Sequence, residues 1–140
     1  MSDKEKFEGF KKELIQKNEE QYGDEVIAKY GKENLDASNR KLMSMSEEQW
    51  EGQKELSERI FALLAEAMKK NDPSCAEAKE AADCHRQWLC LFWKNGLYNK
   101  QAHRGMAEMY VADERFRENI DRHGEGTAAF LSAAIAVYCK

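Results

Sequence analysis

The stretch TAAFLSAAIAVYC, residues 127–139, contains little that is polar beyond Ser132 and indicates a helix that is apolar on every side. The run WLCLFW, residues 88–93, lies inside a longer helical pattern and is apolar right round in the same way. A helix without a polar face has to be covered by neighbours on several sides. Two such central helices, wrapped by amphipathic ones, do not fit a plain four-helix bundle. They predict an all-α domain with globin-like, orthogonal packing of about seven or eight helices.

Helical periodicity continues through the rest of the chain, where Pro73 is the only proline. We predict a first helix after Asp3, a second near 19–30 that ends at Gly31, and a short third through 35–43. A Ser46–Gln49 capping box begins a long fourth helix, and Ser74 or Asp72 caps a fifth over 74–95. A sixth helix covers 100–111, a seventh begins at Asp113, and the last covers 127–139. These helices make one domain, residues 1–140, in which 46–140 form the core.

The N-terminal helices, within residues 1–45, are expected to be mobile and to form a lid. The first helix carries only a narrow apolar stripe, Phe7, Phe10 and Leu14. Ordering its backbone costs about 1–2 kcal/mol per residue, whereas each buried apolar side chain returns only about 1.5–3 kcal/mol. A segment so weakly held can close over a ligand and be ordered by it.

Composition narrows the classes of function. The chain has 140 residues and a net charge of −4, without the excess of Lys and Arg that direct nucleic-acid binding requires. We expect no membrane segment, no signal peptide and a cytoplasmic location. No catalytic motif, metal-ligand spacing or phosphate-binding loop stands out, so we predict a protein that is not an enzyme and has no cofactor. The four cysteines are expected to be free and mostly buried.

The segment 85–116 is dense in aromatic, methionine and histidine residues, more than a small core needs. Any one of these residues taken alone is more simply core, but together they suit a pocket with apolar walls and a few polar groups. We predict a cleft walled by Trp88, Phe92, Tyr98, Met106 and Tyr110 and closed by Phe10, Tyr22 and Tyr30, with His85 and His103 hydrogen-bonding ligand heteroatoms. Two alternatives remain open. One is a protein–protein interaction module that uses the N-terminal helices, and the other is a haem or cofactor protein with a histidine ligand.

Four stretches resemble the TipAS antibiotic-recognition domain family, the ligand-binding half of thiostrepton-induced regulators of the MerR class. They are EKFEGFKKELIQKNEEQYGDEVIAKYG at 5–31, HRQW at 85–88, AEMYVADERF at 107–116 and AAFLSAAIAVY at 128–138. The resemblance implies a globin-like fold that binds thiopeptides or other bulky, largely apolar drugs, with N-terminal helices that become ordered on binding. It also implies either the sensor domain of a MerR-type regulator, whose DNA-binding half is absent or removed, or a free-standing protein that sequesters drug.

One departure from the family concerns covalent capture. The thiostrepton-binding member holds its ligand through a cysteine just upstream of its counterpart of AEMYVADERF. The matching position here falls at or next to Gly105, and Cys90 lies on another helix turn. The resemblance therefore implies reversible binding.

Overall fold

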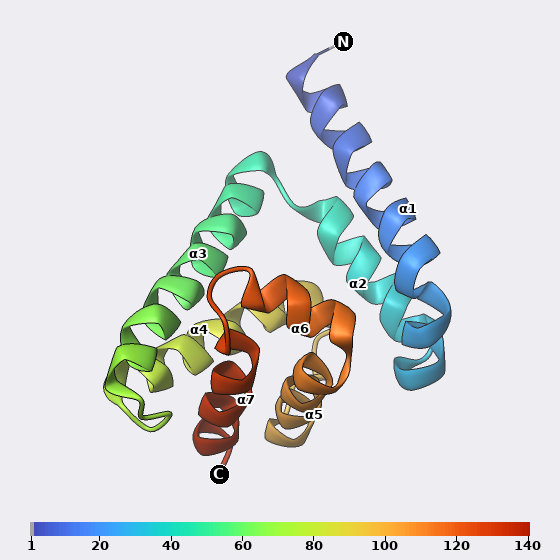
Figure 1. Ribbon diagram of the computed structural model, residues 1–140. Helices are drawn as coiled ribbons and strands as arrows, with labels where there is room; N and C mark the ends of the chain where they lie inside the picture. Colours follow the sequence, from blue (N-terminus) through green and yellow to red (C-terminus); the bar gives the residue numbers. More distant parts are fainter. Residues whose placement is uncertain (1) are drawn as a thin grey trace.

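Seven helices and no strand make up residues 2–140, the part of the chain that the computed structural model describes (Figure 1). The helices are α1 (Asp3–Tyr30), α2 (Lys32–Ser44), α3 (Glu47–Lys70), α4 (Ala76–Phe92), α5 (Lys100–Ala112), α6 (Glu114–Asp121) and α7 (Thr127–Tyr138). The predicted all-α class and helix number are confirmed. Of the predicted lid, Met1 lies outside the described residues.

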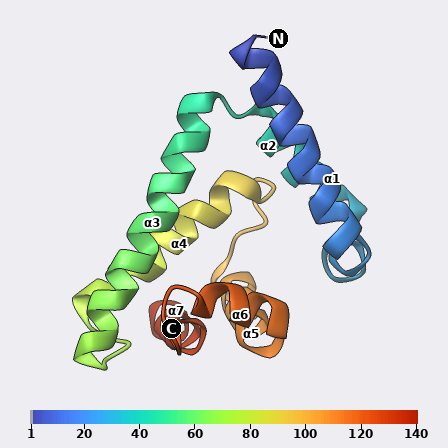
Figure 2. The same cartoon turned by 45° about the horizontal axis from the view of Figure 1, so that its top comes forward.

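Helix α7 lies at the centre of the core, as its sequence predicts. It contacts α3, α4, α5 and α6, and Leu131 and Ile135 on it are almost fully buried. Helices α3 and α4 pack closely against each other and lie beside α7, with α4 passing behind α3 in the view of Figure 2. Ala78, Ala81 and Ala82 of α4 have no exposed surface, and their small side chains let the neighbouring helices approach closely.

The end of α4 differs from the prediction. The helix stops at Phe92 rather than continuing to Asn95. Leu89 is 1% exposed, but Leu91 is 38% exposed and Cys90 is also exposed. WLCLFW is therefore not covered all round, since Cys90 and Leu91 face solvent while Trp88, Phe92 and Trp93 are half-buried.

Most of the predicted helix ends are confirmed. Ser46 and Gln49 form the capping box of α3, the Asp113 side chain caps α6, and Gly31 ends α1 with φ 88°, a backbone angle that suits glycine. The predicted cap of α4 is wrong. Cys75 occupies that position without a side-chain bond, whereas the Asp72 carboxylate instead accepts hydrogen bonds from the backbone and hydroxyl of Ser74 in the preceding turn.

The first two predicted helices are one continuous helix, α1, which pairs with α2 as a hairpin leaning away from the core (Figure 1). The buried side chain of Lys11 holds this pair together. Its ammonium donates to the carbonyl oxygens of Met43, at 2.7 Å, and Met45, at 2.9 Å, at the end of α2. The last carbonyls of a helix lack intrahelical partners, so a lysine in this position satisfies them and offsets the negative end of the helix dipole.

Hydropathy along the helices gives one further result. Across residues 2–140, every helix is either too short or too polar to span a bilayer.

Candidate functional site

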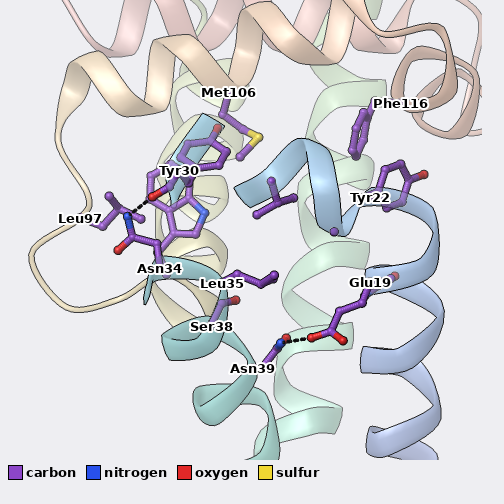
Figure 3. Close-up of a pocket in the computed structure, with 14 residues that line it drawn as sticks. Glu19, Tyr22, Tyr30, Asn34, Leu35, Ser38, Asn39, Leu97, Met106 and Phe116 are labelled. Atoms are coloured by element: carbon purple, nitrogen blue, oxygen red, sulfur yellow. Dashed lines mark hydrogen bonds between the residues drawn. The ribbon is translucent and has the colours of Figure 1, made fainter. Parts of the chain in front are cut away.

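A cleft separates the α1–α2 hairpin from the ends of α4, α5 and α6. Its first compartment, of about 320 Å³, is lined by Asn18, Glu19, Tyr22, Gly23, Val26, Tyr30, Asn34, Leu35, Ser38, Asn39, Trp93, Leu97, Met106 and Phe116 (Figure 3). Its second compartment, of about 250 Å³, is lined by Tyr22, Glu25, Val26, Lys29, Tyr30, Ser38, Trp88, Leu89, Phe92, Trp93, Met106, Met109, Tyr110 and Phe116. The two share half of their lining residues, so they are adjoining parts of one site. The first alone falls within the size range of small-molecule pockets.

An aromatic contact fixes the hairpin over this cleft. The ring of Tyr22 on α1 stacks on that of Phe116 on α6, with centroids 5.2 Å apart and an angle of 27° between the planes. The guanidinium of Arg115 lies 4.9 Å from the centre of the same tyrosine ring. Arg115 also pairs with Glu25 of α1 at 2.6 Å and with Asp113 at 2.7 Å. The hydrogen bonds that the guanidinium donates to Asp113 and then to Glu25 raise its pKa.

Two weaker ties join the hairpin to the end of α4. Glu33 of α2 pairs with Lys94 at 2.5 Å, and that hydrogen bond lowers the pKa of Glu33. The ammonium of Lys41 donates to the carbonyl oxygen of Cys90 at 3.1 Å. All of these polar ties between the hairpin and the core are exposed, and solvent screens exposed ion pairs so that they contribute little to stability. The hairpin is thus held mainly by packing and by the stacked rings.

Beneath the cleft, a chain of hydrogen bonds crosses the core. The hydroxyl of Tyr110 lies 3.1 Å from Nε2 of His85, and Nδ1 of His85 lies 2.9 Å from Nε2 of His103. Nδ1 of His103 lies 2.8 Å from the Tyr98 hydroxyl and 3.5 Å from Sγ of Cys139. Only one proton fits between the two facing ring nitrogens, so this contact requires at least one neutral ring.

Burial lowers the pKa of both histidines. That of His85 falls to about 3, first through loss of solvation and then through the proximity of His103. That of His103 falls to about 4, first through burial and then through the charge of Arg86. Both rings are therefore neutral near pH 7. With His85 4% and His103 0% exposed, both ring nitrogens of each already have protein partners.

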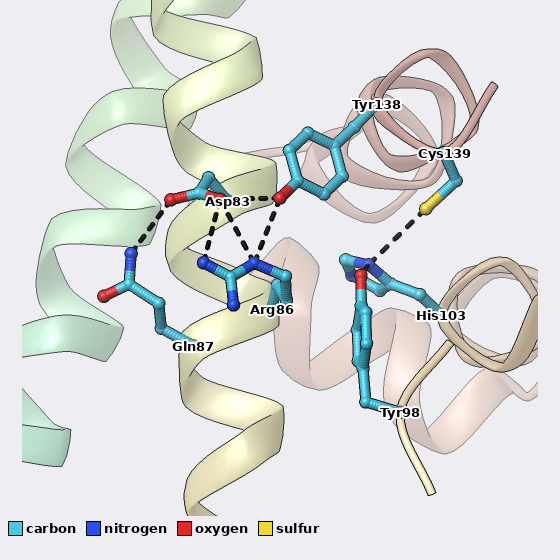
Figure 4. A network of polar contacts seen from close by, with 7 residues as sticks. All are labelled: Asp83, Arg86, Gln87, Tyr98, His103, Tyr138 and Cys139. Carbon is cyan, nitrogen blue, oxygen red and sulfur yellow. Dashed lines mark hydrogen bonds and ion pairs between the residues drawn. The ribbon is translucent and has the colours of Figure 1, made fainter. Parts of the chain in front are cut away.

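A second polar network fastens the end of α7 to α4 (Figure 4). The hydroxyl of Tyr138 donates to the Asp83 carboxylate at 2.6 Å and accepts from Nε of Arg86 at 3.1 Å, while Gln87 donates to the same carboxylate at 2.9 Å. The hydrogen bond from Tyr138 is the main cause that lowers the pKa of Asp83. These residues do not line the cleft, so their part is to hold helices together.

The expected site residues divide into two groups. Tyr22, Tyr30, Trp88, Phe92, Met106 and Tyr110 line the cleft. Phe10 is 45% exposed and meets the edge of Trp50 at 5.4 Å, outside both compartments. Tyr98, His85 and His103 belong to the buried chain and do not line either compartment. The two histidines therefore offer a ligand no free ring nitrogen. A haem iron would need such a nitrogen as its ligand, so the same observation disfavours the haem alternative.

Several lining residues were not expected, namely Val26, Leu35, Trp93, Leu97 and Phe116. Two of them carried a signal in the sequence, since Trp93 closes WLCLFW and Phe116 closes AEMYVADERF. The other three are ordinary aliphatic residues of helices and loops, with nothing local to mark them.

All four cysteines are free. Cys84 and Cys139 are buried, Cys75 is half-buried and Cys90 is exposed, so the expectation of mostly buried thiols is wrong for Cys90. Within residues 2–140, His, Cys, Asp and Glu side chains nowhere gather in a group of three that could hold a metal ion.

Comparisons with known proteins connect this cleft with a family. The sequence model of the TipAS antibiotic-recognition domain matches residues 22–138. The chain is 32% identical over 139 residues to the HTH-type transcriptional activator mta of Bacillus subtilis, covering 99% of this chain and 53% of that protein. It is 33% identical over 120 residues to the HTH-type transcriptional activator TipA of Streptomyces coelicolor, covering 83% of this chain and 46% of that protein. The chain thus spans about half the length of these curated relatives.

A solved structure is similar as well. It is the complex of nosiheptide with TipAS from Streptomyces lividans, described as part of a thiopeptide antibiotic multidrug resistance system. The two chains superpose with a TM-score of 0.65 at 31% identity, over 86% of this chain and 85% of that one.

Proposed function

Because the chain belongs to the TipAS antibiotic-recognition domain family, we propose that it binds bulky, largely apolar antibiotics of the thiopeptide kind, or related small molecules, in the cleft under the α1–α2 hairpin. One observation carries the proposal. Two adjoining compartments, mostly apolar, lie between the hairpin and the core in a chain similar to one solved with nosiheptide.

The side chains of the cleft suit flat heteroaromatic ligands. Tyr22, Trp88, Phe92 and Phe116 offer ring faces, and Met106 offers a flexible thioether that adapts to irregular shapes. Each offset-stacked pair of rings contributes about 0.5–1.5 kcal/mol beyond the burial of its area. A ligand that bridges the hairpin and the core would add contacts on both sides and hold the hairpin closed. The hairpin, residues 3–44, is thus the proposed lid, and 46–140 are the proposed core.

Binding is proposed to be reversible. By the resemblance, the position of the family's reactive cysteine falls at or next to Gly105, where the chain has no cysteine. Cys84 and Cys139 are buried, and neither they nor Cys75 nor Cys90 line the two compartments. A ligand with a dehydroalanine would therefore meet no thiol in the cleft.

In the cell, the domain is proposed to report a drug or to sequester it. The relatives mta and TipA are HTH-type transcriptional activators, so a TipAS-type domain joined to a DNA-binding half would pass ligand binding on to transcription. As a separate protein, the same domain would lower the concentration of free drug. Both roles are those of a cytoplasmic binding protein rather than an enzyme, and with a charge of −4 the domain would leave DNA contacts to another part of the regulator.

Thermal unfolding in the presence of thiopeptides tests the proposal. A ligand at 100 times its dissociation constant stabilises the folded state by about 2.7 kcal/mol. We expect nosiheptide at such an excess to raise the melting temperature by several degrees, and dilution to restore the original value. An unchanged melting temperature over a panel of thiopeptides and other apolar antibiotics would contradict the proposed function.

A further inference from the structure

The first compartment has two chemically different walls. Asn18, Glu19, Asn34, Ser38 and Asn39, its polar lining residues, all come from the α1–α2 hairpin (Figure 3). The core contributes Trp93, Leu97, Met106 and Phe116, which are apolar apart from the indole N–H of Trp93. A ligand in this compartment therefore meets hydrogen-bonding groups on one side and an apolar surface on the other.

The contacts of two asparagines determine which way their amides face. Nδ2 of Asn34 donates to the carbonyl oxygen of Tyr30 at 2.6 Å, and Nδ2 of Asn39 donates to Oε1 of Glu19 at 2.9 Å. A carbonyl and a carboxylate only accept hydrogen bonds, so each amide must turn its nitrogen toward its partner. The amide oxygens of Asn34 and Asn39 are left to accept a hydrogen bond from elsewhere.

The charged groups that line the first compartment also favour ligands that donate hydrogen bonds. Glu19 is the only ionisable carboxyl among the residues that line the first compartment, and these include no Lys, Arg or His. Two cations lie close by but outside this compartment: Lys29, which lines the second compartment with its ammonium 5.3 Å from the centre of the Tyr30 ring, and Arg115, which lies against Tyr22 and pairs with Glu25 and Asp113. With one carboxylate and two amide oxygens, the hairpin wall of the first compartment is rich in acceptors, and no cation lines that compartment to pair with an anion.

We infer that this compartment selects planar ligands that are neutral or cationic and turn N–H donors toward the hairpin, and that it discriminates against carboxylates. The inference rests on the proposed function and assigns the chemical class of the ligand. The apolar face of such a ligand lies on Trp93, Met106 and Phe116. Its N–H groups donate to the carboxylate of Glu19 and to the amide oxygens of the two asparagines. A carboxylate in the same pose would face like charge and find no positive partner.

Three probes with the same tricyclic skeleton test this selectivity, each titrated into the full chain by calorimetry. Proflavine is a cation with two amino donors, acridine lacks such donors, and acridine-9-carboxylate is an anion. We expect proflavine to bind at least about tenfold more tightly than the carboxylate, because its amino groups donate to Glu19 and the amide oxygens, whereas the carboxylate meets like charge. Nosiheptide is titrated in parallel, and it should displace bound proflavine.

Two neighbouring glutamates of α1 supply a matched pair of variants. Glu19→Gln removes the lining carboxylate, whereas Glu20→Gln removes an exposed one outside the cleft, so both change the net charge equally. Glu19→Gln should lower the preference for proflavine over the carboxylate by about threefold or more, the effect of an exposed charge pair. Glu20→Gln should leave that preference unchanged. Circular dichroism checks that both variants keep their helices.

The outcomes separate the two proposals. If nosiheptide binds but proflavine does not, or if the three probes bind alike, or if the two glutamate variants behave alike, the inferred selectivity is overturned while the proposed function stands. If nosiheptide fails to bind but the probes follow the expected order with a Glu19-specific change, the selectivity is supported and thiopeptide binding is not.

Discussion

The ring of Tyr22 lies 5.2 Å, centroid to centroid, from the ring of Phe116, and this stack joins the N-terminal hairpin to the short helix α6 across the cleft. Both residues line both compartments. The contact that holds the hairpin shut is therefore made of the same side chains that a ligand would touch. Closure of the hairpin and binding are coupled through this pair in our account.

Removing the stack is expected to loosen the hairpin without unfolding the core. Tyr22→Ala loses a ring pair of about 0.5–1.5 kcal/mol and a cation–π contact of about 0.5–1 kcal/mol. We predict that amides of α1 and α2 exchange with solvent about tenfold faster, while those of α7 are unchanged. Tyr22→Phe keeps the ring and serves as control. Unaltered exchange in Tyr22→Ala would show that the stack does not hold the hairpin.

Trp88 offers a test of the second compartment. The indole is half-buried, lines that compartment and donates from Nε1 to Oε1 of Gln53 at 3.1 Å. Trp88→Ala should weaken nosiheptide binding at least about tenfold, because a large ring face is lost, while the helical circular dichroism survives. Trp50→Ala, which removes a tryptophan outside the cleft, should bind normally. Loss of helicity in Trp88→Ala would instead assign this ring to the core.

The buried histidines predict sensitivity to acid. Their pKa values of about 3 and about 4 in the folded state lie below the ordinary value of 6.5, so below pH 6.5 the unfolded chain binds protons that the folded chain does not. The stability that the two neutral histidines contribute is fully present above about pH 6.5. It is lost as the pH falls toward their pKa values in the folded state. With two such sites, the slope of the unfolding free energy approaches about 2.7 kcal/mol per pH unit near pH 5.

Denaturant unfolding between pH 7 and 5 measures this slope above the range where most carboxylates titrate. The double variant His85→Gln, His103→Gln should flatten it, and His123→Gln, which removes an exposed histidine, should not. An equal slope in the wild type and the double variant would mean that the two rings already carry charge in the folded protein or titrate as in the unfolded chain.

Denaturing mass spectrometry tests the absence of covalent capture. After incubation with a thiopeptide that carries a dehydroalanine, we predict the intact mass of the unmodified chain, because the cleft holds no cysteine. Gly105→Cys is the informative variant, since it puts a thiol at the half-buried position next to the cleft residue Met106. A stoichiometric adduct on the unaltered chain would contradict reversible binding and would direct attention to the exposed Cys90.

The sequence was sufficient for the parts of the fold that local chemistry decides. Residues 127–139 are apolar all round, which predicts the central helix. Ser46, Asp113 and Gly31 predict helix ends, because each of these ends depends on one side chain or one backbone angle. It failed where tertiary contacts decide. The pairing of α1 with α2 is one such case, because Lys11 binds carbonyls more than thirty residues away in sequence.

The site was predictable to a similar degree. Several of the aromatic residues singled out in the sequence line the cleft, but periodicity does not say which polar-tipped rings face a cavity and which face one another. His85 and His103 are eighteen residues apart and bond each other, a pairing that arises only because the fold brings one residue of α4 and one of α5 together in the core. Asn34 and Asn39, central to the inferred selectivity, look in the sequence like ordinary polar residues of a helix surface.

The most direct test of the account is hydrogen exchange of the full chain with and without saturating nosiheptide. We predict that protection rises over residues 3–44 and at the ends of α4, α5 and α6 that face the hairpin, while the centre of α7 stays as protected as before. Unchanged exchange in the hairpin under conditions where nosiheptide is demonstrably bound would contradict a ligand site beneath it.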